Sequence, residues 1–541
     1  MLLSKKSKKG LLVFLMFFVA ACMALVNLRV GAPQVNIDDF SLYEGGFLVW
    51  FGNAPPQHAY LECWINGLAS MVTFLVKGVL LAGAWDALSL EFVCRAYSDF
   101  YYQPDGYYAV YRFVIVLFNL ATAWLVYLIA HRCSSEKMAG FAPLLALFLY
   151  LFSYNTFWCN LAGRPDTLVA FFAMLGMYFY LQSDYRDDKP FFWLAAVAFG
   201  VAAGLKLHGA FFAIFAAFDL LRAKGIRPGF RSVLILTVIS VLFFMVADGS
   251  LLFDPLKYIK ARMETYVADH SGYLEWGQQF VAVLRGSGWL IAPLTLVSWF
   301  AIRDVGRKSS MRSIVFMAFC WLVLFCSIRQ LRAYWMLPAL PVFYIAAVAV
   351  LDRMKKVGSV LAIIVVIIFL FQSFSEVRNI HATPYNELRN WVEANLSDHD
   401  SAYLIGYSVL RVPRSEKVNG FMKNIIETSL LNDATKYGFT YRHLKYWEEL
   451  SAFRLQDMLI AKKNCGYNII DYVQRRVNFD NNDQFLEQFN YFIVQDKFVL
   501  ENRAVFDHYL EKNFSFVVKL VGEGGRGYGL DYKIYKRNQV D

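Results

Sequence analysis

The sequence has few charged residues and lacks the short motifs typical of nucleotide-binding enzymes. Asp, Glu, Lys and Arg make up 18% of the 541 residues, whereas roughly a quarter of an ordinary soluble protein is charged. It contains no P-loop, and its GxGxxG stretch, GEGGRG at 522–527, lies between two expected strands and opens no helix, which argues against a bound nucleotide. The eight cysteines follow no metal-ligand spacing such as CxxC.

Apolar residues dominate what is present. Hydrophobic residues make up 58% of the chain and aromatic residues 17%. Eleven apolar runs have about the length that a membrane-spanning helix requires. These runs lie near residues 11–30, 109–131, 138–157, 167–182, 190–205, 207–221, 231–248, 285–302, 312–328, 333–350 and 357–374. We therefore predict a polytopic α-helical membrane protein with about eleven transmembrane helices.

A twelfth apolar run, residues 64–85, carries Lys77 near its middle, where a charge costs roughly 2.5 to 3.5 kcal/mol on insertion scales. If this run lies in the interface or re-enters it, every strongly basic block falls on one side, which is then the cytoplasmic side. The blocks are 4–9, 131–137, 183–189, 222–231, 302–312 and 352–356. Because the net charge of +10 lies mostly in these short blocks, it indicates membrane orientation and not nucleic-acid binding.

The same orientation sends the remaining ionisable residues to the outer side. They lie in the loop that contains Asp38 and Asp39 and in the segments 160–166, 204–209, 253–279 and 328–335. After residue 375 the composition becomes that of a soluble protein. An amphipathic helix is expected over 385–396, and the segments AYLIGYS, YFIVQ, FVVKLVG and YKIYKR are expected to be strands. We predict a transmembrane module over 1–375 and an extracytoplasmic α/β domain over 376–541.

An outward-facing site has no ready supply of nucleotide-activated donors, so a transferase there would use a donor that itself crosses the membrane, such as a lipid phosphate ester. A carboxylate can take the proton of an attacking hydroxyl, and cations can stabilise a phosphate leaving group. Asp38 and Asp39 are the candidate base, and Lys206, Arg329 and Arg332 are the candidate cations.

Several segments, taken in order, resemble a known family. They are IDDFSLYEGG, APPQHAYLE, GRPD at the start of a helix, GVAAGLKLHG and RQLRAYWMLPALP. This order is similar to that of the GT-C glycosyltransferases that use polyprenyl-phosphate sugars, close to the protein O-mannosyltransferase and aminoarabinose transferase branch. The resemblance covers most of residues 1–375 and extends to no part of the C-terminal domain.

The resemblance implies an inverting sugar transfer, juxtamembrane helices in the first outer loop and a lipid-phosphate site served by basic residues near the later helices. The family's catalytic acid is the first acidic residue of the first outer loop, which corresponds to Asp38. The next position is usually Glu in the family and is Asp39 here. This departure leaves open which of the two aspartates acts.

Each candidate also has a structural interpretation. Asp38 and Asp39 would suit a helix N-cap, although one cap needs only one Asp. Arg164 and Asp166 fit a structural pair or a helix cap, with a supporting role in the site as the alternative.

The other candidates have structural interpretations too. The Lys206 side chain can extend to the membrane interface, and His208 can be a packing residue. Arg329 and Arg332 can anchor a helix end. Asp269 and His270 offer only two ligands, so metal dependence stays open and a divalent metal is compatible with the sequence.

Two other classes of function, a transporter and a non-catalytic scaffold, are alternatives to a transferase. A transporter or flippase for a lipid or amphiphile would show paired repeats and charges at the membrane midplane, but the sequence shows no repeat and its charges gather at one face. A non-catalytic scaffold needs fewer membrane crossings than the eleven predicted here.

The expected partners are a polyprenyl-phosphate sugar donor, membrane lipids and a glycan, lipid or protein acceptor. We expect a bacterial inner membrane, because no retention signal or long lumenal insertion is found.

Overall fold

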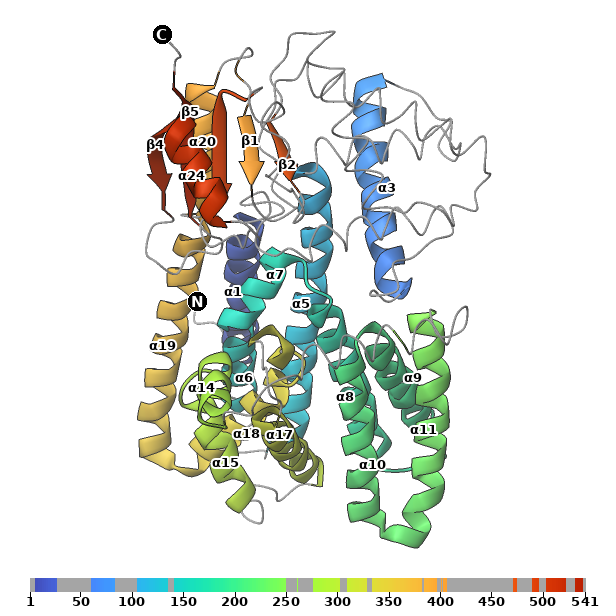
Figure 1. Ribbon diagram of the computed structural model, residues 1–541. Coiled ribbons are helices and arrows are strands. Elements are labelled where there is room, and N and C mark those ends of the chain that lie inside the picture. The colour runs from blue at the N-terminus through green and yellow to red at the C-terminus, as the bar shows by residue number, and fades with distance from the viewer. Residues whose placement is uncertain are drawn as a thin grey trace, which may run out of the picture. The chain divides into compact units, whose positions relative to one another are not determined.

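The computed structural model (Figure 1) describes fifteen stretches of the chain. These are residues 5–26, 60–82, 105–134, 141–249, 260, 276–301, 309–327, 333–381, 384–396, 400, 402–405, 470–473, 489–495, 503–521 and 531–538. They belong to two compact units. The first takes its residues from 1–28, 54–65 and 111–376, and the second from 29–53, 66–110 and 377–541.

Helices occupy each of the eleven apolar runs. They are α1 (Lys5–Val26), α5 (Asp105–Cys133), α6 (Ala142–Leu151), α7 (Tyr154–Ala162), α8 (Asp166–Ser183), α9 (Pro190–Leu205), α10 (Ala210–Lys224), α11 (Ile226–Asp248), α14 (Trp276–Ser287), α15 (Ile291–Phe300), α17 (Ser309–Ser327), α18 (Leu340–Arg353) and α19 (Lys355–His381). Two 3-10 turns, η1 (Leu207–Gly209) and η2 (Ala333–Met336), precede α10 and α18, and helix α3 (Tyr60–Ala82) contains most of the run at 64–85.

Length and composition show which helices can span a bilayer. Within the described stretches, four helices are long and apolar enough to cross a membrane: Gly106–Cys133, Ile226–Asp248, Ser310–Ser327 and Lys356–Ser375. The number rises to six if each of two bent helix pairs is one span. This is the pattern of an integral membrane protein, and the expected total of eleven crossings stays a prediction.

Both bent pairs have a local cause. Helices α6 and α7 meet at 46°, because α7 starts anew at Ser153, whose hydroxyl accepts a hydrogen bond from the Thr156 amide as an N-cap. Helices α14 and α15 meet at 100° through Gly288, whose φ of 88° favours glycine. The runs predicted as single helices near 138–157 and 285–302 are therefore each broken in two.

Helices α8, α9 and α11 pack closely because α9 presents glycines to a neighbour. A Cβ at Gly200 would lie 2.4 Å from the backbone oxygen of Ser240 on α11. A Cβ at Gly204 would lie 2.7 Å from the backbone oxygen of Phe244. The Ser240 hydroxyl also donates to the Ala196 carbonyl oxygen at 2.9 Å. Small residues and interhelical hydrogen bonds of this kind hold membrane helices together.

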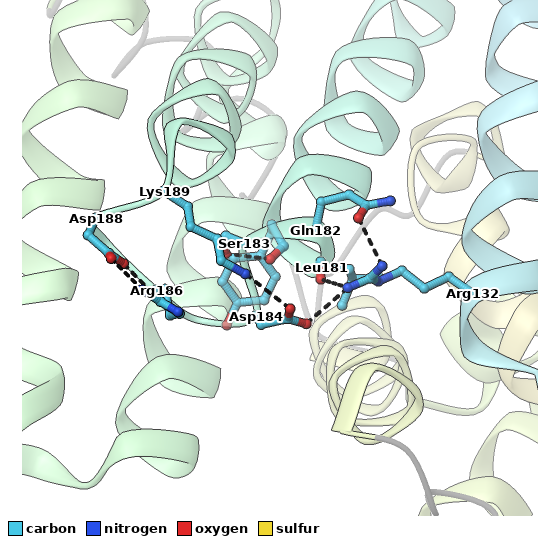
Figure 2. A network of polar contacts seen from close by, with 9 residues as sticks. Arg132, Leu181, Gln182, Ser183, Asp184, Arg186, Asp188 and Lys189 are labelled. Atoms are coloured by element: carbon cyan, nitrogen blue, oxygen red, sulfur yellow. Dashed lines mark hydrogen bonds and ion pairs between the residues drawn. The ribbon is translucent and has the colours of Figure 1, made fainter.

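A network of polar contacts joins the end of α5 to the turn between α8 and α9 (Figure 2). Arg132 at the end of α5 donates to the carboxylate of Asp184 at 2.9 Å, and Lys189 donates to the other oxygen of the same carboxylate at 3.2 Å. Farther along the same turn, Asp187 accepts from Ser232 on α11, whose hydroxyl accepts from Lys224 at 2.7 Å. Three blocks predicted to share one side of the membrane, 131–137, 183–189 and 222–231, therefore do meet at one end of the helices.

The second unit contains a five-stranded mixed sheet of order β2-β1-β3-β5-β4. The strands are β1 (Ala402–Ile405), β2 (Ile470–Val473), β3 (Tyr491–Gln495), β4 (Phe514–Leu520) and β5 (Tyr532–Arg537), with helices α20 (Pro384–Asn395) and α24 (Arg503–Asn513). Strand β1 is parallel to β2 and β3, whereas β5 is antiparallel to β3 and β4. The buried Leu388 and Val392 of α20 share a core with Ile493 and Ile534. The predicted helix at 385–396 is confirmed, and each of the four predicted strands coincides with a strand.

Candidate functional site

Asp166 and Lys206, forty residues apart, form an ion pair where α8 begins and α9 ends. The Lys206 Nζ donates to the two carboxylate oxygens of Asp166 at 2.9 and 3.0 Å. The Asp166 side chain is fully buried, while that of Lys206 is 25% exposed. Lys206 therefore neutralises a buried carboxylate while part of its own side chain stays exposed.

Local backbone geometry presents both side chains to each other. Gly163, with φ at 60°, ends α7 in the left-handed conformation, and Asp166 follows in the first turn of α8. The N-terminal end of a helix favours a carboxylate. Lys206 adopts an extended backbone directly after α9, and α9 packs against α8. The positions of both groups therefore depend on the α8–α9 packing.

His208 lies beside this pair in η1, outside both flanking helices. Its Nε2 is 3.6 Å from the nearer Asp166 oxygen, which is too long for a hydrogen bond. The pKa of His208 is lowered to about 4, chiefly by burial and also by the charge of Lys206, while Asp166 opposes the shift. His208 is therefore neutral at pH 7.

His208 should make the protein less stable in mild acid. Its folded pKa of about 4 lies below the ordinary value near 6.5, so between these pH values the unfolded chain binds a proton that the folded chain does not. Stability should fall by about 3 kcal/mol in total as the pH drops through this window. Thermal unfolding in detergent at pH 7 and pH 4 should show this acid loss in the wild type and less of it in His208→Gln. His131→Gln, at an exposed position, is the control, and an equal acid loss in wild type and His208→Gln would contradict the assignment.

Arg164 is buried, with 5% of its surface exposed, but the cation beside Asp166 is Lys206 and not Arg164. The Arg164 guanidinium lies over the Trp158 ring, 5.4 Å from its centroid. A cation over an aromatic face is a stabilising contact. The structure thus brings together Asp166, Lys206 and His208, and places Arg164 two residues away on the same turn.

The other candidates lie outside the described residues: Asp38, Asp39, Arg329, Arg332, Asp269 and His270. In the part of the chain that the structure describes, no group of three or more His, Cys, Asp or Glu side chains could hold a metal ion.

Four further charged residues near helix ends are buried and were not predicted as site residues from the sequence: Glu62, Arg112, Asp219 and Asp248. Asp248, 1% exposed, ends α11, and its backbone amide lies 3.0 Å from where a Cβ on Gly204 would be. Arg112, also 1% exposed, lies two turns into α5. A charged residue inside or at the edge of an apolar run is the signal that would have found both.

A glycosyltransferase family model and several solved structures are similar to this chain. Residues 101–327, somewhat less than half of the chain, match the sequence model of glycosyltransferase family 87. This range contains Asp166, Lys206 and His208. No curated protein matches the chain.

Among solved structures, ArnT from Cupriavidus metallidurans bound to undecaprenyl phosphate is similar over 97% of this chain and 98% of its own, with 13% identity and a TM-score of 0.52. ArnT from the same organism in the apo state has 12% identity and a TM-score of 0.46, over 97% of each chain. An oligosaccharyltransferase from Archaeoglobus fulgidus in complex with zinc and sulfate has 12% identity and a TM-score of 0.43, over 73% of this chain and 60% of its own. The likeness to the lipid-bound ArnT shows that this chain has the ArnT fold, which confirms the resemblance drawn from the sequence.

Proposed function

We propose that this protein is a membrane glycosyltransferase that transfers a sugar from a polyprenyl-phosphate donor to a hydroxyl acceptor at the extracytoplasmic face. The observation that carries the proposal is the match of residues 101–327 to a glycosyltransferase family model, since this range contains the buried Asp166–Lys206 pair. ArnT, which shares the fold, was solved with undecaprenyl phosphate. The site and the C-terminal domain face away from the cytoplasm of a bacterial inner membrane.

The reaction assigns a task to each candidate residue. Asp38 accepts the proton of the acceptor hydroxyl, while the hydroxyl oxygen attacks the anomeric carbon from the face opposite the phosphate. The bond between that carbon and the phosphate oxygen breaks, and polyprenyl phosphate leaves with the electron pair. The anomeric configuration is inverted. Asp39 orients the acceptor or raises the basicity of Asp38, since adjacent carboxylates shift each other's pKa.

The cations stabilise the charge that develops on the leaving phosphate. Lys206 contributes its ammonium charge to the phosphate site, while Asp166 holds the ammonium in place through two hydrogen bonds. Arg329 and Arg332 complete the site from the segment before η2. Arg164 and His208 support it from the α7–α8 turn and from η1.

The test is sugar transfer by the purified protein. In detergent, with polyprenyl phosphate carrying a radiolabelled sugar and a glycan, lipid or protein acceptor fraction, label should move from the lipid to the acceptor. Heated protein is the control. Labelled lipid that crosses the bilayer of proteoliposomes without any transfer would instead identify a transporter, and the proposal would fail.

A further inference from the structure

Helix α14 turns away from α15 at a sharp corner. The two helices meet at 100° through Gly288, where a Cβ would lie 2.6 Å from the ring of Phe369 on α19. Phe369 lies inside the candidate span Lys356–Ser375, six residues before Ser375, which is about 9 Å along the helix. Helix α15 has ten residues, or about 15 Å, half of a hydrocarbon core about 30 Å thick. The corner therefore lies at a depth that the α19 span covers, and α14 runs across the direction of α15 instead of completing a crossing.

One face of α14 is held against the protein. Val283 and Ser287 are fully buried. The carbonyl oxygen of Gly286 accepts a hydrogen bond from the side-chain Nδ2 of Asn155 on α7 at 2.7 Å. A Cβ at Gly286 would lie 2.6 Å from the sulfur of Met336 in η2. These contacts fix the rotation of α14 about its own axis, so they determine which side chains the opposite face presents.

The opposite face of α14 exposes apolar side chains around one arginine. Phe280 is 45% exposed, and Trp289, just past the corner, is 46% exposed. Val281 is exposed as well, and Arg285 is exposed one helical turn after it. In the described part of the chain, the Arg285 guanidinium makes no hydrogen bond and no ion pair. We use the name α14 face for Phe280, Val281, Arg285 and Trp289.

The apolar members of the α14 face suit lipid acyl chains. Trp289 lies between α14 and α15, and α15 itself exposes Val297 and Phe300, the latter by 79%. Within the depth of a membrane span, an exposed apolar surface of this kind meets hydrocarbon and not water. Trp is also favoured where the hydrocarbon core meets the headgroups. The bilayer around the spanning helices is therefore the expected neighbour of Phe280 and Val281.

Arg285 adds a requirement for an anion. An unpaired charge in the hydrocarbon core is costly, but an arginine side chain can extend toward the headgroups. A guanidinium binds a phosphate group through two parallel hydrogen bonds. Because the corner lies near the Ser375 end of the α19 span, the nearer phosphates are those of the leaflet at that end.

We propose that the α14 face binds an anionic phospholipid of the leaflet that contains the Ser375 end of α19. The phosphodiester of this lipid accepts hydrogen bonds from Arg285, and its acyl chains lie against Phe280, Val281 and Trp289. The site goes beyond the proposed function and does not depend on it, since it needs no sugar donor. An anionic lipid is favoured over a zwitterionic one because its headgroup carries no cation that would repel Arg285.

The experiment is photolabelling of the full-length protein in phosphatidylcholine vesicles that contain a minor fraction of phosphatidylglycerol with a photoreactive acyl chain. Mass spectrometry of peptides gives the amount of label on α14 and, as an internal reference, on α11, which also exposes apolar side chains. One basic side chain near anionic lipid corresponds to about fivefold in binding. Arg285→Gln should therefore lower the label on α14 about fivefold and leave the label on α11 unchanged. Arg285→Lys keeps the charge and should restore most of the label.

Two controls separate lipid binding from other roles of the charge. Lys512→Gln removes an exposed cation from α24 in the second unit and should leave the label on α14 unchanged. With photoreactive phosphatidylcholine in place of phosphatidylglycerol, wild type and Arg285→Gln should carry similar label on α14. A purely structural role for Arg285, as a cation at a helix C-terminus, would instead lower the melting temperature of Arg285→Gln without changing the label, and would overturn the proposal.

The remaining outcomes also decide the proposal. An absence of label on α14 in the wild type, or an equal loss of label on α14 and α11 in Arg285→Gln, overturns it. Unlabelled polyprenyl phosphate should not displace the label from α14. Displacement would assign the α14 face to the sugar donor and overturn the phospholipid. Absence of sugar transfer by the same preparation contradicts the proposed function alone and leaves this site standing.

Discussion

Replacing Asp38 by Asn should lower the rate of sugar transfer about 10² to 10⁴-fold, the range typical of general-base assistance. Asn keeps the shape of the side chain but cannot take the acceptor's proton. Because the base acts on the acceptor, the dissociation constant of polyprenyl phosphate should stay within twofold of the wild type. Initial rates with a labelled donor, together with lipid binding by the same preparation, measure both quantities.

Asp39→Asn is the matched control for this substitution, since it removes the neighbouring carboxylate and should do less damage. A structural role for Asp38 leads to a different result, because Asn caps a helix as well as Asp does. Near-normal transfer by Asp38→Asn at wild-type expression would return both aspartates to a structural role. A greater loss in Asp39→Asn would instead make Asp39 the base.

Replacing Lys206 by Ala should have the second largest effect, on stability and on donor binding together. The substitution leaves the fully buried carboxylate of Asp166 without its cation. Removing one partner of a buried pair costs about 3 to 5 kcal/mol, and we expect the lower end because Lys206 is 25% exposed. Thermal unfolding in detergent should show a large drop in melting temperature.

A second substitution separates the two roles of Lys206. In Lys206→Ala with Asp166→Asn no buried charge is left, so most of the stability should return. Donor binding should stay weak, since the cation that meets the phosphate is still missing. If the double variant binds polyprenyl phosphate as tightly as the wild type, then Lys206 serves only to neutralise Asp166, and the phosphate site must be built from other residues.

The helices of this protein could be predicted from the sequence because a helix in a bilayer satisfies its own backbone hydrogen bonds within one segment. Each apolar run coincides with a helix, and Tyr491–Gln495 and Tyr532–Arg537 match the predicted strands residue for residue. Strand β2, Ile470–Val473, was missed. The breaks between α6 and α7 and between α14 and α15 were also missed, because length and hydropathy do not show where an apolar run bends.

Three of the predicted site residues lie together in the structure, and their functional roles stay predictions. Asp166, Lys206 and His208 were singled out as uncommitted ionisable residues, and they do lie together. Their pairing was not predicted, since the sequence suggested that Arg164 and Asp166 belong together. Arg112 and Asp248 were passed over because each is a single charged residue within or beside an apolar run.

By itself, the sequence determined that this is a membrane protein with many apolar helices and a C-terminal segment of helices and strands, while the orientation that gathers its uncommitted charges on one side stays a prediction. These properties depend on composition and local periodicity, which act over a few turns of helix or one strand. Only the tertiary structure decided that Lys206 neutralises Asp166 and that Asn155 holds Gly286. These contacts join residues 40 and 131 positions apart, and they form because close packing of glycine-bearing helices brings particular side chains within hydrogen-bonding distance.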